Sequence, residues 1–216
     1  DFWVYPAKIE EASTDGIYIS DTLDTEAIKT LQNGGRVLLT AAGKIRYGND
    51  IVQYYTPVFW NTSWFKMRPP HTTGAYINNC HPIFDEFPTE DWSSLQWWEL
   101  MNKTQVMNFN EFPKDFQPTV QSIDTWFISR KAGTLFEANV LGGKLVMTSM
   151  DITSDLNHRI VARQLRKSMI DYMQTDKFRP EFNIDINIVK DLFEKSAPRV
   201  NMFTHDSPDE LKPKRN

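Results

Sequence analysis

The pattern of apolar and polar positions in the first part of the chain predicts a βαβ unit. Residues 16–20 (GIYIS) read as a strand, and the polar side chains that follow offer N-caps for a helix over residues 25–32. Asn33-Gly34-Gly35 would end this helix, and residues 36–40 (RVLLT) read as a second, buried strand. Since strands joined through a helix are parallel, this segment predicts a parallel sheet.

The second half of the chain predicts a hairpin and two further helices. Residues 135–140 and 145–149 flank Gly142-Gly143, a hairpin signal, and residues 120–128 are a further strand candidate. Residues 154–174 show the clearest helical period. Its apolar stripe comprises Leu156, Ile160, Val161, Leu165, Met169, Tyr172 and Met173. Residues 185–195 are a short helix candidate, and the predicted class is α/β: a mostly parallel sheet flanked by helices, with an antiparallel edge hairpin.

The remaining segments predict how the chain is divided. Residues 1–6 contain the run FWVY closed by a proline, which reads as a terminal strand belonging to a preceding domain. Residues 7–15 are linker-like, residues 16–195 form the α/β domain, and residues 196–216 are a polar tail. Within the domain, residues 80–88 suggest a turn with a short helical turn, and residues 91–101 suggest a helix or helical turn.

Composition adds an excess of aromatic residues and a mild negative charge. The 216 residues include 14 Phe, 7 Trp and 7 Tyr, and five of the Trp fall between Trp60 and Trp98. The net charge is −4, which disfavours a protein that binds a phosphate backbone. No stretch approaches the ~20 apolar residues of a membrane span. We therefore expect no nucleic-acid partner and no membrane-spanning segment.

Polar residues that follow two predicted strands are the first candidate site. Asp21 and Thr22 follow residues 16–20, and Asp151 and Thr153 follow the strand that ends near Ser149. Ligands of open α/β sheets bind outside the carboxyl ends of the strands, which predicts a strand-end pocket. The alternative is that such residues cap helices, the reading we favour for Asp24, Ser154 and Asp155.

The aromatic block is the second candidate site. Sugars present C–H faces that lie flat on aromatic rings, while polar neighbours bond their hydroxyls. The residues with this chemistry are Trp60, Asn61, Trp64, Arg68, His71, Gln96, Trp97 and Trp98. The alternative for each Trp is packing, either in the core or at an interface, where aromatics are also enriched.

Nucleophilic and metal chemistry receive little support. A P-loop, a G-x-S-x-G elbow, a G-x-G-x-x-G and an H-E-x-x-H are all missing from the sequence. Cys80 beside His81 suggests a thiol nucleophile, but no strand-turn-helix context would present it. With one cysteine and four isolated histidines, we expect neither a metal site nor a cofactor. A small hydrolase using Asp151 or Cys80 stays open as a third hypothesis.

Several stretches resemble one family. The segments RVLLTAAGKIRYG, VQYYTPVFWNTSWF, HPIFDEFPTEDWSSLQWWEL, DFQPTVQSIDTWF and GKLVMTSMDITSDLNHRIVARQLRKSMIDYM are similar to the C-terminal region of bacterial glycoside hydrolase family 2 proteins of the β-galactosidase-like, sugar-binding-domain type. The resemblance implies a flavodoxin-like domain, similar to class I glutamine amidotransferases. It also implies that residues 1–6 end a preceding immunoglobulin-like β-sandwich.

The same resemblance implies a role. The family's catalytic glutamates belong to a barrel that this sequence does not contain, and an amidotransferase would need a cysteine in a nucleophile elbow. A non-catalytic accessory domain is therefore expected, one that packs on neighbouring domains or on another subunit of a periplasmic or extracellular glycosidase. The alternative is a carbohydrate-binding module that uses the Trp60–Trp98 block.

Overall fold

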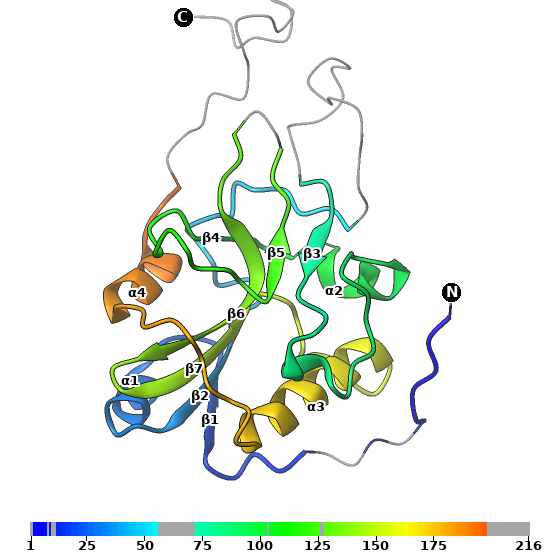
Figure 1. The fold of residues 1–216 in the computed structure, drawn as a ribbon, viewed down its shortest axis with the longest axis horizontal. Coiled ribbons are helices and arrows are strands. Elements are labelled where there is room, and N and C mark those ends of the chain that lie inside the picture. Colours follow the sequence, from blue (N-terminus) through cyan, green and yellow to red (C-terminus); the bar gives the residue numbers. More distant parts are fainter. Residues whose placement is uncertain are drawn as a thin grey trace, which may run out of the picture.

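The protein, seen in a computed structural model that describes residues 2–7, 9, 12–55, 72–102, 104–125 and 128–197, is an α/β structure. Seven strands in these residues form one mixed sheet with helices on both faces (Figure 1). The strands are β1 (Ile17–Ser20), β2 (Arg36–Thr40), β3 (Ala75–Ile77), β4 (Met107–Asn108), β5 (Val120–Ser122), β6 (Ala132–Val140) and β7 (Gly143–Thr148). The helices are α1 (Thr25–Gln32), α2 (Trp98–Met101), α3 (Ile160–Gln174) and α4 (Ile186–Glu194), with 3-10 turns η2 (Pro82–Phe84) and η3 (Leu95–Trp97).

The predicted βαβ unit is confirmed. β1 and β2 pair in parallel, and β7 pairs in parallel with the other edge of β2. Asp24 caps α1 by accepting a hydrogen bond from the Ala27 backbone N–H at 2.8 Å. Gly34, at a φ of +76°, ends α1 in a conformation that side chains disfavour. The carboxyl ends of β1, β2 and β7 consequently lie along one edge of the sheet.

The predicted hairpin is confirmed, but its position in the sheet is not the expected one. Leu141 and Gly142 form the two-residue turn between β6 and β7, with φ values of 53° and 90°, the geometry of a type I′ turn. The strand order is β1-β2-β7-β6-β5-β3, so the hairpin lies at the centre of the sheet. Because nearly all of β6 is buried, the backbone N–H and C=O groups along both of its edges need hydrogen-bond partners from neighbouring strands.

The expectation of a mostly parallel sheet holds only for β1, β2 and β7, because β6 is joined to β7 through a two-residue turn, which only antiparallel strands allow. β6 pairs antiparallel with β7, β5 and β4, and β5 pairs antiparallel with β3. The sheet thus has a parallel half, β1-β2-β7, and an antiparallel half, β6-β5-β3 with β4 beside β6. Short strands such as β5, which spans three residues rather than the nine expected, carry too little periodicity to reveal this pairing.

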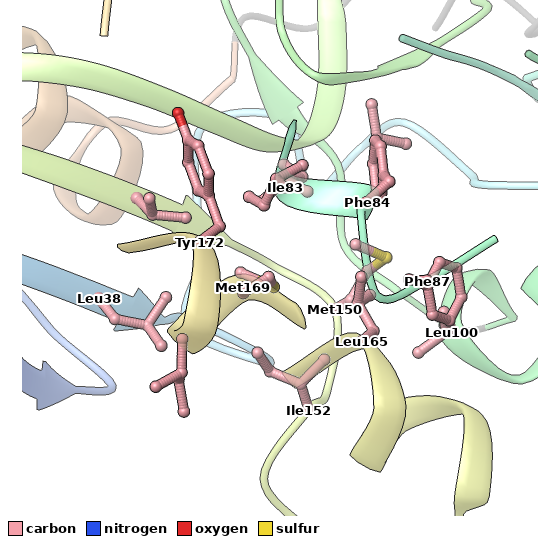
Figure 2. Packing of buried hydrophobic residues seen from close by; sticks show 14 of the residues in the cluster. Leu38, Ile83, Phe84, Phe87, Leu100, Met150, Ile152, Leu165, Met169 and Tyr172 are labelled. Carbon is pink, nitrogen blue, oxygen red and sulfur yellow. The ribbon is translucent and has the colours of Figure 1, made fainter. Parts of the chain in front are cut away.

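Alternate residues of the central strands feed two cores. Leu38 and Val146 face the core beneath α3, whereas Val37 and Leu145 face the core shared by α1 and α4. Figure 2 shows the first core, where α3 packs over the sheet and against η2. Each such buried aliphatic side chain contributes about 1.5–3 kcal/mol relative to exposure. The helix over residues 185–195 is confirmed as α4.

Two local predictions need correction. α3 begins at Ile160, six residues later than expected, because Asp155 adopts a positive φ of 48° and the chain turns before entering the helix. Ile160 is 44% exposed and lies outside the apolar stripe. Residues 2–6 contain no strand; instead Tyr5 stacks on Phe87 at 6.0 Å between ring centroids and hydrogen-bonds the Gln96 side chain. Their assignment to a preceding β-sandwich stays a prediction.

Candidate functional site

The strand-end residues after β1 form local surface contacts. Asp21 pairs with Lys44, which follows β2, at 3.4 Å, with side chains 59% and 49% exposed. The Thr22 backbone N–H donates to the Ser20 hydroxyl at 3.3 Å. The next acid along, Asp24, caps α1, as favoured from the sequence. An exposed ion pair of this kind contributes little to stability, and a ligand site at Asp21 and Thr22 stays a prediction.

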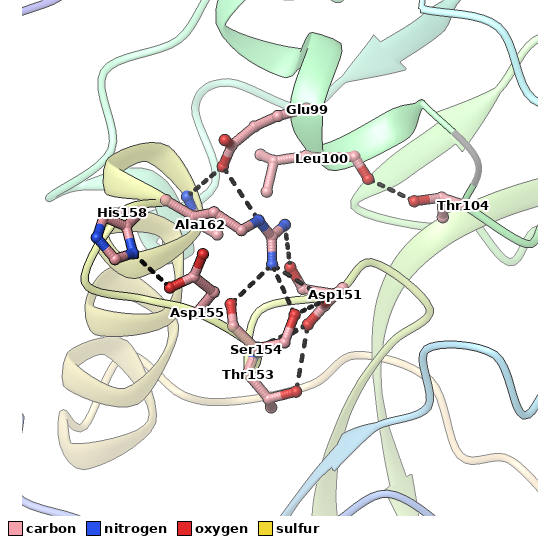
Figure 3. Close-up of polar contacts among 10 residues, drawn as sticks. Glu99, Leu100, Thr104, Asp151, Thr153, Ser154, Asp155, His158 and Ala162 are labelled. Atoms are coloured by element: carbon pink, nitrogen blue, oxygen red, sulfur yellow. Dashed lines mark hydrogen bonds and ion pairs between the residues drawn. The ribbon is translucent and has the colours of Figure 1, made fainter.

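Asp151, after β7, holds the loop that leads to α3 (Figure 3). Its Oδ1 accepts hydrogen bonds from the backbone N–H groups of Thr153 and Ser154, both at 3.0 Å, and from the Thr153 hydroxyl at 3.2 Å. Its Oδ2 accepts the Ser154 hydroxyl and lies 3.1 Å from the guanidinium of Arg159. The structure thus brings Asp151 and Thr153 together, as expected, but in a loop closure.

Arg159 extends this network to the neighbouring helix. It donates to the Asp151 carbonyl at 2.7 Å, and its Nε lies 3.9 Å from Oε1 of Glu99 on α2. The same Glu99 oxygen accepts the Ala162 backbone N–H in the first turn of α3 at 3.0 Å. Both ends of the network are therefore occupied by groups that anchor α3.

The pKa of Asp151 reflects these contacts. Burial raises it, but the hydrogen bonds from Ser154 and Thr153 and the positive charge of Arg159 outweigh burial and lower the pKa to about 2. A carboxylate this strongly committed to its own loop is a poor general base near neutral pH, where a pKa close to 7 is favourable. These contacts indicate a structural role for Asp151, and a ligand site at this edge of the sheet stays a prediction.

The aromatic block divides into a buried and an exposed part. Trp97 is fully buried and packs edge-on against Phe84 and Phe87, at 6.0 and 5.4 Å between centroids. Its indole N–H donates to the Thr89 hydroxyl at 2.8 Å. Gln96 is also buried, where its amide donates to the Pro88 carbonyl at 2.9 Å. The packing alternative holds for both residues, and the sugar contact expected of them is corrected.

Trp98 is the exposed member of the block. It is 49% exposed. Leu95, one turn earlier, is 66% exposed, and Val52 is 39% exposed. We call these three side chains the Trp98 surface. Beside it, Trp98, Tyr54, Tyr55, Asn102 and Gln105 help to line a pocket of about 510 Å³. The other candidates of the block, Trp60, Asn61, Trp64, Arg68 and His71, lie outside the described residues.

A second pocket, in the antiparallel half of the sheet, contains chemistry that the sequence did not reveal. It has a volume of about 390 Å³ and includes Tyr76 of β3, Gln121 of β5 and Glu137 of β6 in its lining. Glu137 lies at the point where β6 extends past the end of β5, so its side chain emerges beside the pocket rather than under a neighbouring strand. We call this hollow the Glu137 pocket.

Glu137 is fixed between a tyrosine and a histidine. Its Oε2 accepts the Tyr172 hydroxyl of α3 at 2.7 Å, and its Oε1 lies 3.5 Å from Nε2 of His81. The other ring nitrogen of His81, Nδ1, accepts the Ile83 backbone N–H at 3.2 Å, which places the proton of the neutral ring on Nε2, facing Glu137. Burial and the nearby charge of Glu137 raise the pKa of Tyr172 far above its usual value, so it stays a donor.

This arrangement bears on Cys80. The thiol is exposed and its Sγ lies 3.4 Å from Oδ1 of Asn79. Both ring nitrogens of His81 are directed at Ile83 and Glu137, so the adjacent histidine is not positioned as the base of a thiol nucleophile. Among the described residues, no three His, Cys, Asp or Glu side chains form a group that could hold a metal ion.

One sequence signal could have identified the Glu137 pocket. Glu137 is the one ionisable residue in the strand LFEANV, and a carboxylate in a strand buried on both faces must find hydrogen-bond partners or a solvent-filled hollow. His81 and Tyr172, its partners, are 56 and 35 residues away in sequence, and no spacing rule connects them.

The protein is thus an α/β domain built on a mixed sheet, with one pocket beside Trp98 and another beside Glu137. Residues 18–194 match the model of a family described as Domain of unknown function (DUF8487), and because this match covers well over half of the chain, the protein belongs to that family. A search among curated proteins gives no match. In the part of the chain that the structure describes, each helix is too short or too polar to cross a bilayer.

Proposed function

We propose that this protein is a non-catalytic accessory domain of a β-galactosidase-like glycoside hydrolase, which packs against a neighbouring domain of the enzyme. The observation that carries the proposal is the Trp98 surface, where Trp98 and Val52 are exposed in the lining of one pocket and Leu95 is exposed one turn before Trp98. Exposed apolar clusters on a folded domain mark interaction sites, and aromatic residues are enriched in interface cores. The resemblance in sequence to family 2 enzymes supplies the identity of the neighbour.

The non-catalytic part of the proposal is supported by the groups that catalysis would need. The Asp151 carboxylate accepts hydrogen bonds from its own loop, and the ring nitrogens of His81 face Ile83 and Glu137 rather than the Cys80 thiol. The parallel order β1-β2-β7, with helices on both faces, supports a flavodoxin-like relationship for that half of the sheet. The proposal includes a periplasmic or extracellular location, which rests on the resemblance alone.

The test combines activity with assembly. We expect no turnover of chromogenic galactosides by this chain, and hydrolysis that persists through purification would contradict the proposal. Mixed with the catalytic part of such an enzyme, the chain should associate in sedimentation experiments, and Leu95→Ser with Trp98→Ala should weaken the association. Leu141→Asn, which removes a side chain of similar exposure at the hairpin turn, is the matched control and should have no effect.

A second function, carbohydrate binding at the Trp98 surface, is favoured by the pocket beside it. Two tyrosines and Trp98 supply ring faces there, and Asn102 and Gln105 supply amides. If sugars bind at this position, an oligosaccharide titration should give heat that Trp98→Ala abolishes. An unchanged heat with Trp98→Ala would remove this second function and leave the packing role as it stands.

A further inference from the structure

We propose that the Glu137 pocket binds a saccharide unit that carries no acidic group. This inference is independent of the packing role, because the pocket and the Trp98 surface share no residue. The volume of about 390 Å³ lies within the range of about 300–1,000 Å³ found for small-molecule sites. The described lining combines aromatic rings, amides and carboxylates, so its surface is polar and aromatic rather than aliphatic.

Glu137 and His81, which both line the pocket, are placed to bind a hydroxyl group. Oε1 of Glu137 and Nε2 of His81 lie 3.5 Å apart, longer than the 2.7–3.2 Å of a normal hydrogen bond, and both residues line the pocket. A hydroxyl can donate to the carboxylate and accept from the His81 N–H at the same time. An ammonium group cannot accept, and a carboxylate cannot donate, so this pair of partners selects an alcohol.

The side chains of Glu137 and His81 are also held rigidly, which is what selective binding requires. Tyr172 donates to Glu137 at 2.7 Å, and its ring packs edge-on against His81 at 5.3 Å between centroids. The Ile83 backbone N–H fixes the other side of the imidazole. Glu137 and His81 therefore hold their positions before a ligand arrives, which reduces the entropy lost on binding.

Other residues that line the pocket supply an aromatic ring and negative charge for recognition of the ligand. Tyr76 is 40% exposed and meets Trp92 edge-on at 6.0 Å, which leaves ring surface for the C–H face of a sugar. The described residues that line the pocket include the carboxylates Asp115, Glu137 and Glu181 and neither lysine nor arginine. Their negative charge repels a uronic acid, whereas neutral sugars and amino sugars meet no such penalty.

The experiment titrates the full chain with galactose and glucose, and in parallel with galacturonate and glucuronate, each up to about 10 mM. Calorimetry reports binding, and tryptophan fluorescence reports the environment of Trp92, whose ring contacts the pocket residue Tyr76. We expect at least one neutral sugar to bind and both uronic acids to fail. Absence of binding by both neutral sugars, or equal binding of the acids, would overturn the proposal.

Variants place the binding in this pocket. Glu137→Gln, which preserves shape while removing the charge, should weaken the neutral sugar about tenfold or more, and Trp92→Phe should remove the fluorescence change while the heat remains. Leu141→Asn, at the hairpin turn and outside both surfaces, is the control and should leave the affinity unchanged. If Trp98→Ala abolishes binding and Glu137→Gln does not, the ligand occupies the other surface and the proposal is wrong.

Discussion

The parallel and the antiparallel halves of the sheet use their carboxylates differently. In the parallel half, Asp21 and Asp151 follow strand ends, where α/β proteins usually bind ligands, yet Asp21 pairs with a surface lysine and Asp151 closes a loop. In the antiparallel half, Glu137 is held by Tyr172 and opens onto a pocket. The position of a candidate site therefore depends on the partners of each residue, since the fold class alone points to a different edge of the sheet.

The largest expected effect tests whether the aromatic residues beside the antiparallel half are core. Trp97→Ala should lower the free energy of unfolding by about 3–5 kcal/mol, because it removes a fully buried ring and leaves a cavity. Trp98→Ala, at the adjacent and half-exposed position, should cost about 1 kcal/mol or less. Urea unfolding measures both, and equal losses would show that the division into core and surface is mistaken.

The next effect tests the anchoring of Glu137. Glu137→Ala removes the acceptor of the Tyr172 hydroxyl, at about 1–3 kcal/mol for a buried group that loses its partner. We expect a loss of that size in thermal or chemical unfolding. Tyr172→Phe in the same background should then cost less than it does in the wild type, and strictly additive losses would contradict the hydrogen bond between them.

The sequence was sufficient for elements whose signal is local. The βαβ unit, the β6–β7 turn and α4 follow from caps, glycines and apolar period within about ten residues. It was insufficient for β3, β4 and β5, which are two or three residues long and acquire their pairing from distant strands. The start of α3 was misplaced because the Asp155 turn interrupts a pattern that continues through it.

The candidate sites show the same limit. The sequence does not distinguish Trp97 from Trp98, because the two side chains are identical and adjacent. They differ in that only Trp97 packs against Phe84 and Phe87. The partners of Glu137 come from η2's N-terminal flank and from α3, and only tertiary structure brings them together. The Asp151 loop was predictable in part, because Thr153 and Ser154 lie within its reach in the chain.

The third effect tests the structural role of Asp151 through pH. Asp151→Ala should cost about 1 kcal/mol near neutral pH, where the carboxylate accepts its hydrogen bonds. The pKa of Asp151 is about 2 in the folded protein, against an ordinary 3.8, so this stabilisation is present above about pH 4 and is lost as the pH falls toward 2. Unfolding curves of wild type and variant should converge over that interval, and a constant difference would contradict the assignment.

The smallest effect tests the other strand-end acid. Asp21→Asn should change the free energy of unfolding by less than about 0.5 kcal/mol, because the pair with Lys44 is exposed and screened by salt. The same variant should leave sugar binding untouched. A measured loss above about 1 kcal/mol would show that the strand-end edge is more than a surface turn.

One measurement tests the central comparison most directly: the calorimetric affinity of the full chain for galactose or glucose, determined for Glu137→Gln and Asp151→Asn side by side. We predict that Glu137→Gln weakens binding by about tenfold or more, near 1.4 kcal/mol, while Asp151→Asn lowers stability and leaves the affinity unchanged. Loss of binding with Asp151→Asn and normal affinity with Glu137→Gln would contradict the account, and would return the ligand site to the carboxyl ends of the parallel strands.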